Sequence, residues 1–374
     1  MIYIHIPFCK QKCSYCNFHF STSLGFKDEM LAAMKTEIFL RKDELQSKNL
    51  RSLYFGGGTP SILTPDEIKT LIDEVLKHFT FENDIEITLE ANPDDLDKSF
   101  LRGLSGSSIN RLSIGTQSFF EDDLKLMNRA HTANEAEDSI KRSQDFGFEN
   151  LSIDLIYGSP TSNLKIWKEN LNKTVALEVP HISSYALTIE SKTALENWIS
   201  KGKVKSPREE EQNKEFYYLS DFLKNNGFEH YEVSNFAKPG FYSRHNSGYW
   251  KYKEYLGIGP SAHSYNGFDI RSWNVANNQQ YIKKLNSNLL AKEEEVLSME
   301  DQFNEMIMIG LRTIWGVDLE NLKQKFNGRI LEHFQNETKS KLEEKVLIIE
   351  GNHLKIPEKH WFMADGIASD LFIV

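Results

Sequence analysis

Residues 1–18, MIYIHIPFCKQKCSYCNF, contain all three cysteines of the 374-residue chain. Cys9, Cys13 and Cys16 follow the spacing C-x3-C-x2-C. Three cysteines cannot form a closed set of disulfides, and their crowding into one short loop is typical of metal ligands. The stretch therefore predicts a metal site, which is either a zinc ion or an iron–sulfur cluster held by three thiolates.

The two kinds of site differ in the ligands that they need. Structural zinc prefers a closed shell of four ligands, so His5, His19 or a distant histidine would have to complete it. An iron–sulfur cluster usually takes four thiolates, and three thiolates on a four-iron cluster would leave one iron open to a small molecule.

The residues around the cysteines separate these alternatives. YxHIPFC at residues 3–9, followed by Cys13, Tyr15 and Cys16, resembles the radical S-adenosylmethionine (SAM) proteins, and within them the branch of oxygen-independent coproporphyrinogen III oxidase and the heme chaperone HemW. The resemblance covers nearly the whole chain. It implies a [4Fe-4S] cluster on Cys9, Cys13 and Cys16, with SAM bound at the open iron.

Composition limits the class of protein. The chain is 40% hydrophobic and 26% charged. These are ordinary values for a globular protein, and the length suggests two domains. A net charge of −10 and a pI of about 5.6 argue against a nucleic-acid partner.

No apolar run approaches the roughly 20 residues of a membrane helix. We expect no signal peptide and a reducing, cytoplasmic setting, which keeps the thiols free for metal. Peripheral contact with a membrane stays open.

Strand and helix patterns alternate as far as the helix expected at 208–226. Strands are predicted at 2–6, 51–55, 85–91, 110–116, 150–157 and 181–187. Helices are predicted at 28–49, from a cap at Thr64, and at 97–104, 121–127, 134–146, 163–177 and 208–226. Six strands separated by helices favour parallel βα units. The resemblance implies an α/β fold of this kind, an open six-unit (βα)6 partial TIM barrel.

Unusual residues fall where the predicted strands end. The cysteine loop follows the first strand, and GGGTP at 56–60 follows the second. Glu90, Asn92, Gln117 and Ala186 close later strands, and Asp154 is a charge inside an apolar strand. The carboxyl ends of parallel strands carry the active sites of βα barrels. We therefore expect these residues to gather on one rim.

The resemblance assigns most of this rim to SAM. The glycines of 56–60 let a ligand approach the backbone, although they also suit a plain tight turn. A buried Asp154 needs donors, either from a ligand or from a nearby arginine. The SAM-binding residues implied by the resemblance are Tyr3, Gly57, Gly58, Thr59, Glu90, Gln117, Arg129, Asp154 and Ala186.

Two departures argue against the oxidase. The oxidase pattern has a further cysteine two residues after the third, where this chain has Phe18, and it has an extension before the YxHIPFC stretch, which we do not expect here. HNxxYW at 245–250 resembles the signature of the heme chaperones and implies that His245 contacts heme. Tyr249 and Trp250 of the motif are expected to stack on the flat porphyrin. His263 is a second candidate, and a purely structural histidine is the alternative for both.

The C-terminal third is expected to differ from the barrel. We predict a radical SAM barrel over 1–235, a barrel-closing segment over 236–297 with irregular structure over 240–290, and a small winged-helix-like α+β domain over 298–374. Nine Lys/Arg against thirteen Asp/Glu in the last region argue against DNA binding there.

These features predict a heme chaperone with a [4Fe-4S] cluster and SAM as cofactors. Its partners would be heme and acceptor hemoproteins, with those of the respiratory chain as candidates, and a homodimer stays open. The alternatives are oxidative decarboxylation of coproporphyrinogen III through a 5′-deoxyadenosyl radical, and a radical SAM enzyme with another substrate.

Overall fold

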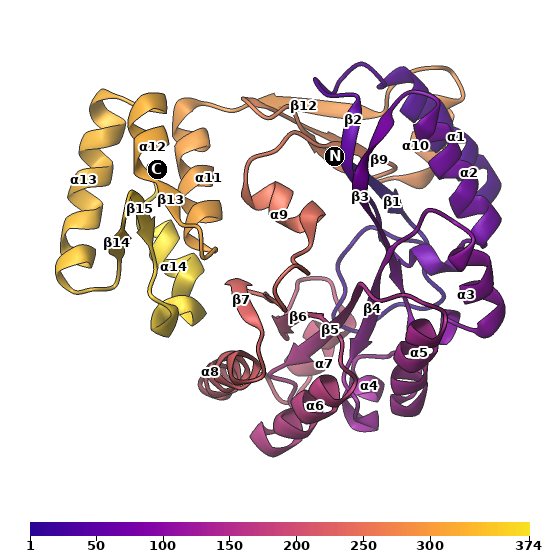
Figure 1. Ribbon diagram of the computed structural model, residues 1–374, viewed down its shortest axis with the longest axis horizontal. Helices are drawn as coiled ribbons and strands as arrows, with labels where there is room; N and C mark the ends of the chain where they lie inside the picture. Colours follow the sequence, from indigo (N-terminus) through magenta and orange to yellow (C-terminus); the bar gives the residue numbers. More distant parts are fainter.

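A nine-stranded sheet, curved into an open barrel, is the largest feature of the computed structural model, which describes all 374 residues (Figure 1). Its strand order is β7-β8-β6-β5-β4-β3-β2-β1-β9. The strands are β1 (Ile2–Ile6), β2 (Asn49–Gly57), β3 (Thr80–Ala91), β4 (Arg111–Gln117), β5 (Leu151–Tyr157), β6 (His181–Ala186), β7 (Glu229–Glu232), β8 (Asn235–Ala237) and β9 (Leu256–Ile258).

Strands β1 to β6 are each parallel to the next, which confirms the six predicted βα units. Helices cover the convex face of the sheet and leave its concave face to later segments (Figure 1). These helices are α1 (Lys27–Leu40), α2 (Pro65–Leu76), α3 (Lys98–Ser105), α4 (Glu121–Leu126), α5 (Ala133–Asp145), α6 (Leu164–Ala176), α7 (Ala194–Ser200) and α8 (Glu209–Asn225), with short 3-10 turns at Pro60–Ile62 and Pro93–Asp95.

Local chemistry explains where these helices begin. Thr64 accepts a hydrogen bond from the backbone N–H of Glu67, and the Glu67 side chain accepts one from the backbone of Thr64 in return, which forms the predicted capping box before α2. Thr132 and Glu135 repeat the arrangement before α5. On the inner side, β4 is buried along its entire length, as expected for a central strand of a parallel sheet.

The predicted helix over 28–49 is too long, because α1 ends at Leu40. Arg41 is buried and donates to Glu37, to Glu44 and to the carbonyl of Gly257 in β9. The following turn is held by Glu254, which accepts from two backbone N–H groups at residues 46 and 47. Gly257 and Glu254 lie far along the chain, so the sequence around residue 41 gives no sign of the helix end.

The prediction that residues 240–290 are irregular is wrong. β9 extends the barrel sheet beside β1, and β10-β11-β12 form a separate antiparallel sheet. Their short lengths and their Tyr, Asn and Gly content hide the alternation that marks a strand. The segment contains α9 (Arg244–Trp250), β10 (His263–Tyr265), β11 (Ile270–Asn274), α10 (Asn278–Leu285) and β12 (Lys292–Val296).

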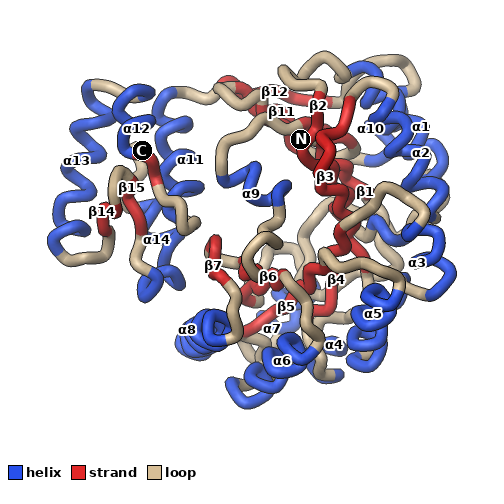
Figure 2. The backbone as a smooth tube through the Cα atoms, in the orientation of Figure 1, coloured by secondary structure: helices blue, strands red, loops and turns tan.

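The C-terminal residues form a small α+β unit beside the open side of the barrel (Figures 1 and 2). Its order of helix, strand, two helices and a hairpin is the predicted winged-helix-like arrangement, with the sheet β13-β15-β14. None of the helices in the chain is long and apolar enough to span a bilayer. The elements are α11 (Met299–Leu311), β13 (Val317–Asp318), α12 (Leu319–Lys325), α13 (Gly328–Glu343), β14 (Ile348–Glu350), β15 (His353–Lys355), a 3-10 turn (Glu358–Met363) and α14 (Ala364–Ser369).

Candidate functional site

The cysteine loop is held in place from both of its ends. The backbone of Cys9 donates to Ser21, and Ser14 binds the carbonyls of Met127 and Leu126 through its N–H at 3.0 Å and its hydroxyl at 2.7 Å. All three cysteines are free thiols and half-buried. Burial raises the pKa of Cys9 to about 11, so a metal or a cation is needed to hold this thiolate at neutral pH.

A chain of hydrogen bonds links two of the thiols. Thr59 donates to Cys9 Sγ at 3.5 Å, and Arg129 donates to Cys13 Sγ at 3.3 Å. Between them, Asn92 donates to Thr59 at 3.5 Å and accepts from Arg129 at 2.7 Å. Hydrogen bonds and a cation at the sulfurs stabilise thiolate ligands and tune an iron–sulfur cluster. The donor set therefore fits such a cluster.

The histidines proposed to complete a zinc site are engaged elsewhere. His5 pairs its Nε2 with the carbonyl of His19 at 2.9 Å and its Nδ1 with the Tyr3 hydroxyl at 3.2 Å. His19 pairs its Nε2 with Asn278 at 2.7 Å. No histidine or carboxylate joins the cysteines as a ligand of a single metal ion. A closed zinc site on the cysteine loop is not assembled here.

The glycines after β2 leave no room for side chains. A Cβ on Gly58 would lie 2.5 Å from the carbonyl oxygen of Phe8, and a Cβ on Gly57 would lie 2.5 Å from the His5 ring. Gly57 also has φ +109°, a conformation that other residues rarely adopt. The N–H groups of Gly58 and of Thr59 donate to the carbonyls of Ile6 and Phe8. The 56–60 loop is thus bound directly against the cysteine loop.

Glu90 and Tyr3 lie next to this loop. Glu90 accepts from the Gly57 N–H at 3.2 Å and from the Tyr54 hydroxyl at 2.8 Å. Burial raises the pKa of Glu90 to about 7, and these two donors oppose the shift. The rings of Tyr3 and Tyr54 stack with centroids 6.0 Å apart. A carboxylate held in this way suits a cationic or hydroxyl-bearing ligand.

Three other predicted residues extend the same rim. Gln117 closes β4 with a left-handed backbone, at φ 64, where the pairing with β5 is irregular. Such strained geometry is of the kind found at binding sites. Asp154 accepts from Ser113 at 3.4 Å, and burial raises its pKa to about 6. Ala186 ends β6 and pairs with Tyr157, the last residue of β5. The structure brings the predicted strand-end residues to one edge of the sheet.

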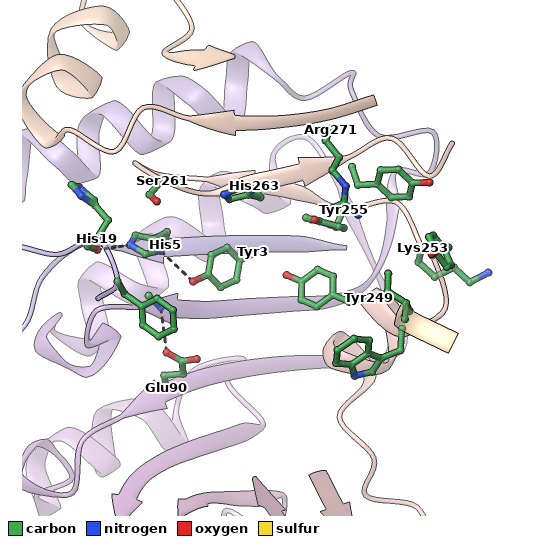
Figure 3. Close-up of a pocket in the computed structure, with 16 residues that line it drawn as sticks. Tyr3, His5, His19, Glu90, Tyr249, Lys253, Tyr255, Ser261, His263 and Arg271 are labelled. Carbon is green, nitrogen blue, oxygen red and sulfur yellow. Dashed lines mark hydrogen bonds between the residues drawn. The ribbon is translucent and has the colours of Figure 1, made fainter. Parts of the chain in front are cut away.

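A cavity of about 510 Å³ begins at this rim and runs toward the C-terminal unit (Figure 3). This volume lies in the range of roughly 300–1,000 Å³ for small-molecule sites. Half of its lining residues are hydrophobic. The lining as a whole comes from β1, β2, β3, the loop that follows the cysteines, the segment 249–255, the sheet β10-β11-β12 with the loop before it, and α11. Its lining residues are Tyr3, His5, Phe18, His19, Gly57, Glu90, Tyr249, Trp250, Tyr252, Lys253, Tyr255, Ser261, His263, Tyr265, Arg271 and Ile309.

His245 does not line this cavity, contrary to the expected heme contact. It is 2% exposed and lies in helix α9, not in a loop. Its Nδ1 pairs with the Ser52 hydroxyl at 2.8 Å, and its Nε2 pairs with the Tyr249 hydroxyl at 2.8 Å. Both ring nitrogens are therefore occupied, and burial lowers the pKa of His245 to about 3. In this structure His245 supports Tyr249, which does line the cavity.

His263, the second candidate, has the exposure that His245 lacks. It lies on β10 with an exposed ring, has no side-chain hydrogen bond and lines the cavity beside Ser261 (Figure 3). Its cross-strand neighbour is Trp273, with ring centroids 6.0 Å apart. Burial and the nearby Arg271 lower its pKa, which favours the neutral imidazole that coordinates metals.

Several residues of the site were not predicted. Asn92 was expected on the rim beside Glu90, but the hydrogen bonds by which it connects Thr59 to Arg129 were not predicted. The segment 249–255 contributes five cavity residues, of which Tyr249 and Trp250 were expected from the HNxxYW motif and the other three were not. Arg271 and Ile309 could not be predicted from the sequence, because only the fold brings β11 and α11 to the cavity.

Comparisons with known proteins agree with this arrangement. Residues 3–173 match the radical SAM superfamily, and residues 297–363 match the HemN C-terminal domain. The chain is 33% identical to the heme chaperone HemW of Lactococcus lactis, over 98% of this chain and 95% of the relative. It is 34% identical to HemW of Bacillus subtilis, over 92% of each. The structure of coproporphyrinogen III oxidase (HemN) from Escherichia coli superposes with a TM-score of 0.84, covering 99% of this chain and 89% of the other at 22% identity, which is a likeness of fold.

Proposed function

Since the chain belongs to the HemW family of radical SAM proteins, we propose that it is a heme chaperone, which binds heme in the cavity beside its cysteine loop and passes it to acceptor hemoproteins. The observation that carries the proposal is the cavity itself. It joins the rim of the barrel to a wall of aromatic side chains from residues 249–255, which is the environment that a flat porphyrin requires.

The cluster and SAM would occupy the rim. Cys9, Cys13 and Cys16 would hold a [4Fe-4S] cluster, with Thr59 and Arg129 donating to two of the sulfurs. The backbone at Gly57 and Gly58, the carboxylates of Glu90 and Asp154, and the side chains of Tyr3 and Gln117 would orient SAM. The bound cluster would supply an open iron site and the capacity to transfer one electron.

Heme would lie along the aromatic wall, with His263 as the iron contact. This histidine replaces His245 in the proposal because its ring is free, whereas His245 has both nitrogens bonded. Tyr249 would pack against the porphyrin, held by the Ser52–His245–Tyr249 hydrogen bonds. The acceptors, which include hemoproteins of the respiratory chain as candidates, would take heme from the open side of this cavity.

The proposal is tested by loading the anaerobically reconstituted protein with heme and mixing it with apomyoglobin. If the protein transfers heme, the absorption spectrum of myoglobin should appear while the spectrum of the heme-loaded protein declines. His263→Ala should weaken heme binding, whereas a matched His353→Ala change on the distant hairpin should not. Absence of heme binding by the wild-type protein would overturn the proposal.

The alternative, oxidation of coproporphyrinogen III, rests on the likeness of fold to HemN. Phe18 occupies the position of the additional cysteine in the oxidase pattern, and it is 70% exposed at the edge of the cavity. We expect no protoporphyrinogen when the reconstituted protein is given coproporphyrinogen III, SAM and a reductant without oxygen. Formation of protoporphyrinogen would contradict the chaperone function and support the oxidase function.

A further inference from the structure

One end of the cavity is rich in hydrogen-bond donors. Lys253, Tyr255 and Arg271 lie at the end opposite Glu90 and His5 (Figure 3). Glu305 of α11 accepts from Arg271 Nε and Nη2, each at 2.7 Å, and Nη1 has no carboxylate partner. Lys253 is exposed and forms no ion pair, and the Tyr255 hydroxyl donates no hydrogen bond. Each of the three side chains therefore has a donor to offer.

Two more donors are buried in the same wall. The indole N–H of Trp250 and the hydroxyl of Tyr252 are shielded from solvent and have no hydrogen-bond partner. Buried donors are nearly always paired, so a cluster of unpaired ones indicates an acceptor that binds from outside. The carboxylate that contacts Arg271, that of Glu305, is already bound to its guanidinium. The missing acceptor is thus an anion, and the guanidinium and ammonium groups suit a carboxylate.

We propose that this end of the cavity is a carboxylate subsite, in which Lys253, Tyr255 and Arg271 bind the propionate groups of heme and so fix its orientation. The inference rests on the proposed function, since it places the same ligand in the same cavity. The reverse orientation would bring the propionates to Glu90, where like charges repel. The edge of the porphyrin without carboxylates would then face Tyr3 and Phe18.

The test compares heme with heme dimethyl ester, in which both propionates are neutral. Absorption titrations of the reconstituted protein should show that the ester binds about tenfold more weakly, the change expected for loss of one or two charged hydrogen bonds. Lys253→Gln and Tyr255→Phe should each weaken heme binding and leave binding of the ester unchanged. Lys251→Gln is the matched control, because its ammonium lies over the Trp315 ring, 4.2 Å from the centroid, and outside the cavity.

The outcomes separate the two proposals. Equal affinity of the wild-type protein for heme and its ester would overturn the carboxylate subsite and leave the chaperone function standing. If the ester binds more weakly than heme but Lys253→Gln and Tyr255→Phe leave heme binding unchanged, the assignment of the subsite to this end of the cavity is overturned. Failure of the wild-type protein to bind either compound would overturn the proposed function itself.

Discussion

At the scale of single residues, Arg129 connects the cysteine loop to the barrel. Its guanidinium donates to Cys13 Sγ, to the Asn92 side chain and to the carbonyl of Gly115, and its Nε is buried without a partner. One cation thus contacts a proposed cluster ligand and two strand ends. Its charge should influence how readily the proposed cluster accepts an electron.

Arg129→Gln is expected to lower the reduction potential of the reconstituted cluster. The reduced cluster carries one more negative charge, which the guanidinium stabilises through its charge and its hydrogen bond to sulfur. The measurement is a redox titration followed by electron paramagnetic resonance. Arg142→Gln is the control, because that side chain donates to the Leu96 carbonyl on the outer layer of the barrel. An unchanged potential in Arg129→Gln would contradict this role.

Gly58→Ala is expected to remove most of the iron from the reconstituted protein. The added methyl group would lie 2.5 Å from the Phe8 carbonyl oxygen and 2.9 Å from that of Ile6, so the cysteine loop must shift. Iron and labile sulfide per chain are the readouts. Gly366→Ala, in α14, adds a methyl group with no other atom nearby. This control should stabilise the helix by up to ~1 kcal/mol. Full iron content in Gly58→Ala would contradict the tight packing described here.

Residues in continuous motifs were predictable, because their chemistry is local. Cys9, Cys13 and Cys16 share one loop, and Gly57 and Gly58 follow one strand. The role of His245 was not predictable, since its hydrogen-bond partner Ser52 lies 193 residues earlier in the chain. Its resemblance to a heme-binding motif also gave no information on burial.

At the scale of elements, α9 fills the open side of the barrel, which no strand closes (Figure 1). Its first N–H groups, those of Arg244 and His245, donate to the buried Glu86 carboxylate of β3 at 2.9 Å. The Ser243 side chain caps the same end. The helix thereby places Tyr249 and Trp250 on the cavity wall.

His245→Gln is expected to reduce the loss of stability in mild acid. Burial holds the pKa of His245 at about 3 in the folded chain, against 6.5 for a free histidine, so between these values only the unfolded chain takes up the proton. Stability supplied by the neutral His245 is therefore lost as the pH falls below 6.5. Between neutral pH and pH 5 the wild type should lose about 2 kcal/mol more than the variant. Urea unfolding at both pH values measures this, and identical losses would contradict it.

At the scale of the whole molecule, side-chain contacts and backbone hydrogen bonds, such as those of Val233 with Arg312 and of Ile314 with Tyr231, attach the C-terminal unit to the rest of the chain. Arg271 pairs with Glu305 at the cavity, and Glu358 accepts from Ser220 of α8 at 2.7 Å and pairs with Lys224 at 2.5 Å. Buried His230 lies 3.6 Å from the same carboxylate. Since Ile309 of α11 lines the cavity, the attachment of this unit bears directly on the proposed heme site.

Glu358→Gln is expected to loosen the C-terminal unit by about 1 kcal/mol, a small effect because the side chain is partly exposed and water screens the pair. Hydrogen bonds from His230 and Lys224 lower the pKa of Glu358 to about 2, so the contribution is full above pH 4.5 and is lost as the pH falls toward 2. Amide hydrogen exchange over residues 358–369 should accelerate at neutral pH. Exchange equal to that of the wild type would contradict the contact.

The barrel was predictable at this scale because each βα unit repeats a local pattern, as the capping boxes of α2 and α5 show. The small sheet β10-β11-β12 was not predictable, since its strands are short and their pairing is visible only in three dimensions. It supplies His263, which the sequence offered as a candidate, and Arg271, whose place in the cavity only the fold reveals.

The most direct test of the account is an experimental structure of the heme-loaded protein. We predict heme in the cavity between the barrel rim and α11, with its iron near His263 and its propionates at Lys253, Tyr255 and Arg271. Heme bound at another surface, or coordinated by His245 after displacement of Ser52 and Tyr249, would contradict the account.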